Sequence, residues 1–251
     1  MKRLLVLAAL LAIIVACAVV AHATPTLTGA TGGVSLPDVK TTPTGVLDIG
    51  LNYQRQKLAN ADEATNASAT YGLSSNAEMG IKYTRQAGIN TPGLDNWGAN
   101  LKYVLPIKFM DLDIASGVNY AKYKDLASNQ FQAYVVGGAN VWQSYNGDRT
   151  LDFNIGVNWT KFETTGPDIK RFRGFTVVDY GFRSNLHMVG EYQTEAKMDS
   201  DPLTSLVVRY NMDENLSWQF GITNAFRGVT GGSEHNWFLG ASYALSQFHE
   251  K

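Results

Sequence analysis

Apolar and polar residues alternate along most of the chain from residue 45 onward. In the first such stretch Leu47, Ile49 and Leu51 fall on one side of an extended chain, and Asp48 and Asn52 fall on the other. A period of two is typical of a β-strand with one apolar and one polar face. Repetition of this pattern between turn-forming residues predicts an all-β chain of twelve strands, at 45–55, 65–73, 77–87, 96–105, 110–122, 130–144, 150–162, 171–182, 186–196, 203–212, 215–225 and 235–246.

Three segments of the chain share a hairpin pattern. Residues 71–83 are closely repeated at 180–192 and more loosely at 210–218. Each copy has an aromatic residue near the end of one strand, a short polar turn rich in Ser, Asp or Asn, and a second alternating strand. Such turns join neighbouring antiparallel strands. The recurrence predicts hairpins as the repeating unit of the fold.

The links between the predicted strands alternate in length. Links after even-numbered strands are short, and most of those after odd-numbered strands are longer; the fourth link is expected at 106–109. An up-and-down antiparallel transmembrane β-barrel has this pattern, because tight turns close one rim and longer loops the other. A soluble sandwich of two sheets does not require it. The link lengths therefore favour the barrel.

Aromatic residues gather near the ends of the predicted strands, on the apolar face. Trp and Tyr are enriched at both interfaces of a bilayer, because their rings are amphipathic. The residues that we expect at the membrane interfaces are Tyr71, Trp97, Tyr103, Tyr120, Trp159, Tyr180, Tyr192, Tyr210, Trp218, Trp237 and Tyr243. This distribution predicts that the apolar faces contact lipid and that the opposite faces line an enclosed lumen.

Charged residues of both signs occupy the polar faces. The residues expected to line the lumen are Glu78, Lys82, Lys102, Asp111, Asp113, Asp152, Arg171, Arg173, Asp179, Arg183, Glu191 and Arg209. They form either ion pairs that keep the wall rigid or a ring that selects ions. A barrel of about twelve strands is wider than its own side chains can fill, so its lumen is either wet or plugged.

The start of the chain has the features of an export signal. A basic head at Lys2 and Arg3 precedes an apolar run to Val20 and a small-residue cleavage pattern at 21–23. We expect a signal peptide over 1–23, an extended periplasmic or plug segment over 24–44, and a transmembrane β-barrel over 45–248. An alternative is lipoprotein processing, with acylation of Cys17.

Composition and charge exclude several classes of function. The chain of 251 residues has a formal net charge of −1 and no basic block, so nucleic acid is not an expected partner. Its single cysteine allows no internal disulfide. His187, His235 and His249 do not converge in the predicted barrel, so we expect no metal, no cofactor and no catalytic residues.

The pattern Tyr-Gly-Leu-x-x-Asn-x-Glu-Met-Gly at 71–80 resembles hairpin turns of bacterial outer-membrane β-barrel proteins. This resemblance implies the outer membrane of a Gram-negative cell, with outer-membrane lipid and the barrel-assembly machinery as partners. Residues 27–38 and 43–50 are similar to the amino-terminal segment of the YjbH-type family of lipoproteins and barrels linked with exopolysaccharide. That second resemblance implies a link to polysaccharide export.

Three functions follow from these observations as hypotheses. The leading one is a non-enzymatic, porin-like narrow pore or an envelope structural component, with small solutes or polysaccharide as its partners. The second is an outer-membrane barrel enzyme that acts on lipid or envelope polymer, with Ser233 and His235 at the outer rim. The third is a soluble secreted β protein that binds carbohydrate through Trp and Tyr.

Overall fold

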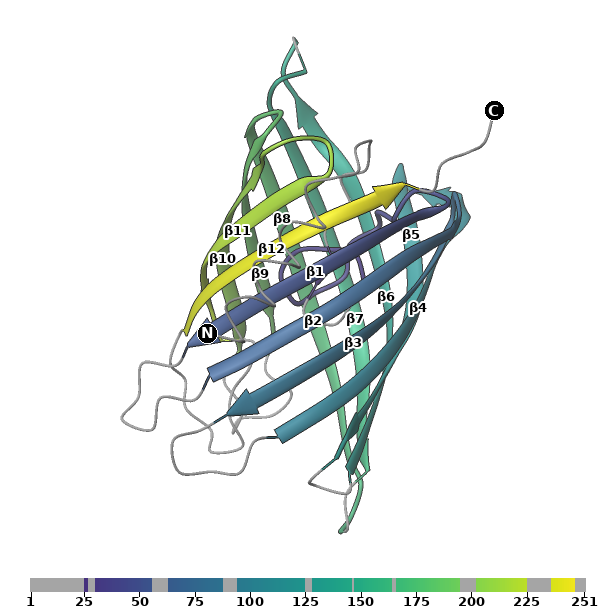
Figure 1. Cartoon of the computed structure of the whole chain (residues 1–251). Coiled ribbons are helices and arrows are strands. Elements are labelled where there is room, and N and C mark those ends of the chain that lie inside the picture. The colour runs from purple at the N-terminus through teal and green to yellow at the C-terminus, as the bar shows by residue number, and fades with distance from the viewer. Residues whose placement is uncertain are drawn as a thin grey trace, which may run out of the picture.

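The computed structural model is a closed antiparallel barrel of twelve strands (Figure 1). It describes residues 25–26, 30–55, 63–87, 94–124, 128–145, 147–163, 166–194, 202–224 and 236–246. The strands are β1 (Val46–Arg55), β2 (Glu63–Ser74), β3 (Ala77–Ala87), β4 (Leu94–Phe109), β5 (Leu112–Tyr123), β6 (Ser128–Gln143), β7 (Thr150–Glu163), β8 (Ile169–Arg183), β9 (Leu186–Gln193), β10 (Leu203–Asn211), β11 (Leu216–Thr223) and β12 (Asn236–Ser246). The expected signal peptide, residues 1–23, lies outside the described residues.

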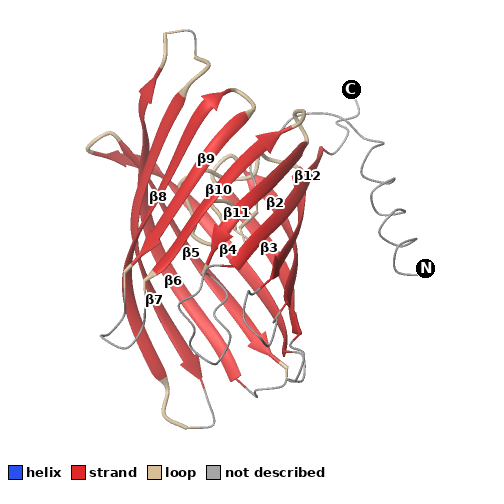
Figure 2. Cartoon of the chain, turned by 90° about the vertical axis from the view of Figure 1, so that its left-hand side faces the viewer, coloured by secondary structure: helices blue, strands red, loops and turns tan. Residues whose placement is uncertain are grey.

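Each strand pairs with its neighbours in the sequence, and β1 closes the barrel against β12. Ile49 on β1 is in register with Ala69 on β2 and with Tyr243 on β12. The strands are tilted and wrap around a common interior (Figure 2). Closure leaves no strand edge unpaired, as a sheet surrounded by lipid requires. The predicted fold, an all-β up-and-down barrel of about twelve strands, is confirmed.

The two rims of the barrel differ in their connections. The links at 75–76, 110–111, 144–149, 184–185 and 212–215 lie at one rim, together with Val46 and Ser246 at the two ends of the barrel. We call this the turn rim. The strand ends at Arg55, Ala87, Tyr123, Glu163, Gln193 and Thr223 lie at the other rim, which we call the loop rim. In bacterial outer-membrane barrels the short turns are periplasmic, so we expect the turn rim to be the periplasmic one.

The strand β4 is longer than its sequence predicts. It continues through Pro106 to Phe109, where a link was expected, and the register against β5 shifts between Leu105 and Lys108. A bulge tolerates proline because the extra residues leave the hydrogen-bonded ladder. The connection is therefore the pair Met110 and Asp111, with φ of 50° and 64°. Two successive positive φ values are typical of the tight type I′ hairpin turn.

The outer wall of the barrel is apolar. Ile81, Ile155 and Phe220 alternate with buried residues along their strands, and each is more than half exposed. No described helix has the length and apolar character needed to cross a membrane. A soluble secreted β protein would expose this apolar wall to water at a large cost, so that alternative does not fit the surface.

Most of the aromatic residues expected at the interfaces lie on the outer wall. Exposed side chains are those of Trp97, Tyr103, Tyr120, Tyr192, Tyr210, Trp218 and Trp237, and partly exposed ones are those of Tyr71, Trp159 and Tyr180. Tyr243 differs, because its side chain is only 7% exposed. It lies between Ile49 and Leu216, its register partners on the two neighbouring strands. Tyr243 is on the same face of β12 as the exposed Trp237 and Leu239, so its place at the membrane interface stays a prediction.

Candidate functional site

Residues 30–44 form what we call the luminal segment, which lies inside the barrel until it leaves at the turn rim (Figure 1). Its hydrogen bonds reach Glu78 on β3 and Glu191 on β9, which are six strands apart around the closed sheet. Ala30, Val34 and Leu36 are each no more than 3% exposed. A segment bound to opposite walls and shielded in this way crosses the lumen.

Glu191 holds the centre of the luminal segment by its backbone. Its carboxylate accepts hydrogen bonds from the N–H groups of Val34 at 2.6 Å, Ser35 at 2.9 Å and Leu36 at 2.9 Å, and from the Ser35 hydroxyl at 2.8 Å. Successive N–H groups that converge on one anion form a nest, and charge-assisted bonds of this kind are strong. A Cβ on Gly33 would lie 2.4 Å from Glu191 Oε1. Glycine at this position therefore permits the close approach.

Glu78 and Lys102 hold the start of the segment as a buried ion pair. Glu78 accepts hydrogen bonds from the Thr31 N–H at 2.8 Å and from the Thr42 N–H at 2.7 Å. Lys102 Nζ donates to the Thr31 carbonyl at 3.0 Å and lies 3.5 Å from Glu78 Oε1. Both side chains are fully buried. Charges so far from water are tolerated when they are paired and hydrogen-bonded, and both conditions hold here.

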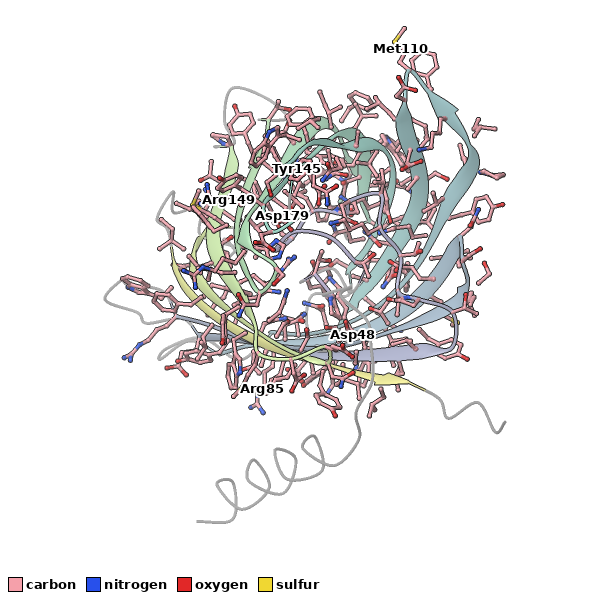
Figure 3. All side chains as sticks on the ribbon, turned by 90° about the horizontal axis from the view of Figure 1, so that it is seen from above. Asp48, Arg85, Met110, Tyr145, Arg149 and Asp179 are labelled. Carbon is pink, nitrogen blue, oxygen red and sulfur yellow. The ribbon has the colours of Figure 1, made fainter. Side chains whose placement is uncertain are left out.

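Arg209 on β10 binds the carbonyl groups of the same segment. Its Nη2 donates to Gly32 O at 3.1 Å and to Gly33 O at 3.2 Å, and its Nη1 lies 3.4 Å from Asp179 Oδ2. Asp179 in turn lies 2.8 Å from His187 Nδ1. The wall thus offers an acceptor to the N–H groups of the segment and a donor to its carbonyl groups. Figure 3 shows Asp179 on the luminal side of the wall.

Two apolar side chains of the segment dock into apolar patches on the inner wall. Leu36 packs within a buried cluster that includes Tyr134, Val136 and Phe175, and Val34 packs against Val207 and Phe238. These inward apolar side chains were not predicted, because the inner face was expected to be polar. A signal was present, because apolar residues occupy both faces at 134–136, 177–178, 207–208 and 238–239.

The segment leaves the lumen at the turn rim. Lys40 Nζ forms an ion pair of 2.6 Å with Asp152 on β7, and the Val39 N–H donates to Asn154 Oδ1 at 3.3 Å. Burial disfavours the Lys40 ammonium, but the carboxylates of Asp38 and Asp152 outweigh it, so the pKa of Lys40 is raised above its ordinary value of 10.5. A Cβ on Gly72 would lie 2.1 Å from the Pro43 carbonyl oxygen, so only glycine allows the chain to pass β2 so closely.

The residues expected to line the lumen fall into four groups. Those that contact the luminal segment are Glu78, Lys102, Asp152, Asp179, Glu191 and Arg209, where Asp179 acts through Arg209. Asp113 forms an ion pair of 3.4 Å with Lys108 at the turn rim and lines a cavity of about 520 Å³ beside Lys40 and Asp152. Lys82, Arg171 and Arg173 lie nearer the loop rim. Asp111 and Arg183 do not line the lumen.

Local backbone geometry explains why Asp111 and Arg183 do not line the lumen. Asp111 belongs to the tight turn between β4 and β5 and has a positive φ, so it is outside the strand wall. The register of β8 against β9 shifts between Gly181 and Arg183, which makes Arg183 the partner of Leu186. One extra residue at a bulge reverses the face on which the following side chain lies. The expectation that Asp111 and Arg183 line the lumen is therefore wrong.

The half of the lumen nearer the loop rim is basic and rich in amides. Lys82 makes no ion pair within the described part of the chain, Arg171 lies 5.6 Å from the Phe162 ring centre, and Arg173 donates to Gln193 at 3.2 Å. No described strand residue between the luminal segment and the loop rim places a carboxylate on the inner face. Buried amide groups whose hydrogen-bonding atoms have no partner among the described residues are those of Gln54, Asn100 and Asn158.

The described residues contain one His–Asp pair, His187 with Asp179, and no candidate metal site. No described group of three or more His, Cys, Asp and Glu residues could hold a metal ion. His187 is bound to Asp179 within the network that holds the luminal segment. Ser233 and His235, which the enzyme hypothesis placed at the outer rim, lie outside the described residues.

Solved structures similar to this chain include two porins. The KdgM porin aligns with a TM-score of 0.57 at 13% identity, covering 81% of this chain and 99% of that one. The NanC porin aligns with a TM-score of 0.56 at 11% identity, covering 78% and 98% of the two chains. No protein-family model and no curated protein sequence matches the chain. The chain therefore has the fold of a bacterial outer-membrane β-barrel, and its apolar wall is the surface that such a barrel presents to lipid.

Proposed function

We propose that the protein is a narrow, gated outer-membrane channel for small anionic or polyhydroxylated solutes, which enter from the loop rim. The observation that carries this proposal is the basic and amide-rich half of the lumen. Lys82 and Arg171 supply positive charge there, and no described strand residue places a carboxylate on that part of the inner wall. Charged rings and polar walls of this kind select solutes in channels.

The luminal segment acts in this proposal as the gate. It occupies the lumen at the level of Glu78 and Glu191, and it is hydrogen-bonded to both of these opposite walls. Its bonds to the wall are made mainly by backbone groups, so a solute with alternating donors and acceptors can compete for the same partners. A sugar chain has this character, because each hydroxyl group both donates and accepts.

Acidic oligosaccharides are the first solutes to test. The KdgM porin has a second structure in complex with disordered oligogalacturonate, which aligns equally well with this chain. The resemblance of residues 27–38 and 43–50 to the YjbH-type family points in the same direction, toward polysaccharide. We propose an acidic oligosaccharide as the solute because its carboxylates complement the positive charges of Lys82 and Arg171.

Recording in planar bilayers tests the channel. The wild-type protein is expected to remain closed for most of the record, and a Gly33→Val variant to show discrete, anion-selective conductance, because the added side chain clashes with Glu191. Replacing Lys82 and Arg171 by glutamine in that variant should shift the reversal potential toward cation selectivity. Oligogalacturonate should reduce the current of the Gly33→Val variant, and a neutral oligosaccharide of equal length should reduce it less.

A structural role in the envelope is the second candidate. The observation that favours it is the number of buried charged contacts that hold the luminal segment, since displacing a segment held by Glu78, Lys102, Glu191 and Arg209 is costly. A Gly33→Val variant that folds and stays closed would support this candidate over the channel. In both cases we propose that the protein is not an enzyme, because His187 is engaged by Asp179 in the same network.

A further inference from the structure

A second cavity lies at the turn rim, outside the lumen and its site. It has a volume of about 630 Å³ and lies between the link from β6 to β7 and the link from β8 to β9. Its lining includes Trp142, Ser144, Arg149, Phe182, Arg183 and Asn185. Two aromatic rings, two guanidinium groups and several polar side chains therefore surround one space, and neither the luminal segment nor the channel proposal uses any of them.

Two bulges turn the lining residues of this cavity outward. The register of β6 against β7 shifts between Asn140 and Trp142, so that Trp142 pairs with Leu151 on the outer face. The register of β8 against β9 shifts in the same way and places Arg183 on the outer face, next to Phe182. Bulges at barrel rims commonly redirect side chains. Both are at the turn rim, on hairpins that follow each other in the sheet.

The cavity carries uncompensated positive charge. The side chains of Arg149 and Arg183 are exposed, and neither guanidinium forms an ion pair with any described residue. Asp148 also lines the cavity, so its three charged side chains sum to +1. Arg is the residue best suited to bind phosphate, because its planar donors match two phosphate oxygens at once. The Ser144 hydroxyl accepts a hydrogen bond of 2.9 Å from the Arg149 N–H and so holds the link that carries Arg149, and the amide of Asn185 lies beside the same cavity.

The aromatic side chains beside this cavity indicate the depth at which it lies in the membrane. Trp142 and Phe182 are 44% and 41% exposed on the outer wall, and Tyr180 packs edge to face on Phe182 at 4.6 Å between ring centres. Aromatic side chains on the outer wall of a barrel lie at the level of the lipid headgroups. A phosphate held by Arg149 and Arg183 would therefore lie at headgroup height, with its acyl chains against the apolar wall.

We propose that this cavity binds the phosphate of an anionic phospholipid in the leaflet that surrounds the turn rim. Guanidinium groups bind the phosphodiester, and the aromatic rings contact the glycerol and the first carbons of the acyl chains. The site depends on the barrel lying in a membrane but not on the channel proposal, and bilayer recordings test the channel separately. Basic pockets beside membrane-spanning elements are known to bind lipid head groups in general.

Native mass spectrometry of the folded full chain in detergent tests the proposal, with phosphatidylglycerol as the probe. The wild type should retain one phosphatidylglycerol, and the Arg149→Gln/Arg183→Gln double variant should bind it at least about tenfold more weakly, as expected from the loss of two charge-assisted contacts. Arg85→Gln is the matched control, because Arg85 is also exposed on the outer wall but lies near the loop rim. Figure 3 labels Arg85 and Arg149, which lie on different parts of the wall.

Three results would overturn the proposal. Unchanged phosphatidylglycerol binding by the double variant would exclude the arginines as its ligands. Displacement of the lipid by an equal concentration of inorganic phosphate would show a site for free anions. Equal binding of diacylglycerol, which has no phosphate, would show that the rings alone bind lipid. Heat-modifiable mobility on a gel checks that each variant is folded before it is compared.

Discussion

The Glu191 carboxylate accepts a hydrogen bond of 2.6 Å from the Val34 N–H, although the two residues are 157 positions apart in the sequence. This contact joins the far wall of the barrel to the segment that precedes the first strand. It belongs to a set in which wall carboxylates bind N–H groups of the segment and Arg209 and Lys102 bind its carbonyl groups. The inner wall thus has hydrogen-bonding partners for both the N–H and the carbonyl groups of the segment's backbone.

Removing the Glu191 charge should release the luminal segment. Each hydrogen bond to a charged group contributes about 1.5–3 kcal/mol, and Glu191→Ala removes several from the segment. A cysteine at Ser35, in a Cys17→Ser background, should be protected from maleimide in the otherwise wild-type barrel, because Ser35 is 7% exposed. It should become reactive in the Glu191→Ala variant. A cysteine at Thr44, which is exposed, should react in both barrels and serves as the control.

Shortening Leu36 should loosen the segment without changing any charge. Leu36 is 3% exposed in a cluster with Tyr134, Val136 and Phe175, and large-to-small changes at such positions cost about 2–5 kcal/mol. Leu36→Ala should therefore increase maleimide reactivity of a cysteine at Ser35. Leu239→Ala on the outer wall removes the same atoms from a lipid-facing position and should leave that reactivity unchanged. Equal protection in both variants would mean that the apolar cluster does not hold the segment.

The ion pair of Lys40 with Asp152 should give a pH dependence at alkaline pH. The pKa of Lys40 is raised in the folded chain, after burial is outweighed by Asp38 and Asp152, so its contribution to stability is fully present below the ordinary lysine value of 10.5. That contribution is lost as the pH rises through the raised value. The unfolding temperature of the wild type should therefore begin to fall at a lower pH than that of Lys40→Arg, because arginine keeps its charge at alkaline pH.

A matched lysine separates this effect from general alkaline destabilisation. Lys122 is exposed on the outer face of β5, away from the luminal segment. The unfolding temperature of Lys122→Arg should equal that of the wild type at every pH. If the unfolding temperature of Lys40→Arg also equals it at every pH, the ion pair with Asp152 makes no contribution to stability.

The turn between β4 and β5 should be improved by glycine. Met110 has a φ of 50° and is 81% exposed, so its side chain gains no packing in exchange for a left-handed backbone. Such a backbone costs about 1–2 kcal/mol for an ordinary residue. Replacing Met110 and Asp111 by Asn-Gly, the preferred type I′ pair, should raise the free energy of unfolding by about 1 kcal/mol in a denaturant titration. A decrease would show that Met110 makes a stabilising contact.

The fold could be predicted from the sequence because it depends on a local pattern. Alternation at Leu47, Ile49 and Leu51, repeated with short turns, specifies strands, their faces and their order around a closed sheet. The errors occur where one extra residue enters a strand. Pro106 and Arg183 both lie at register shifts, and alternation alone does not reveal where a bulge reverses the faces.

The site was less predictable because its contacts join distant parts of the chain. The sequence identified Glu78, Lys102 and Glu191 as charged residues on inner faces, but not that one segment binds all three. Inward residues such as Val136 and Phe175 were missed because a lumen was expected to be polar throughout. Leu36 packs against these residues inside the lumen, which explains why they are apolar.

Single-channel recording of wild-type protein beside Gly33→Val tests the central claim most directly, namely that residues 30–44 close a channel whose loop-rim half favours anions. The account predicts a wild type that is closed for most of the record and a folded Gly33→Val variant with anion-selective openings that oligogalacturonate reduces. A wild type that is as open as the variant, or a variant whose openings favour cations, would contradict it.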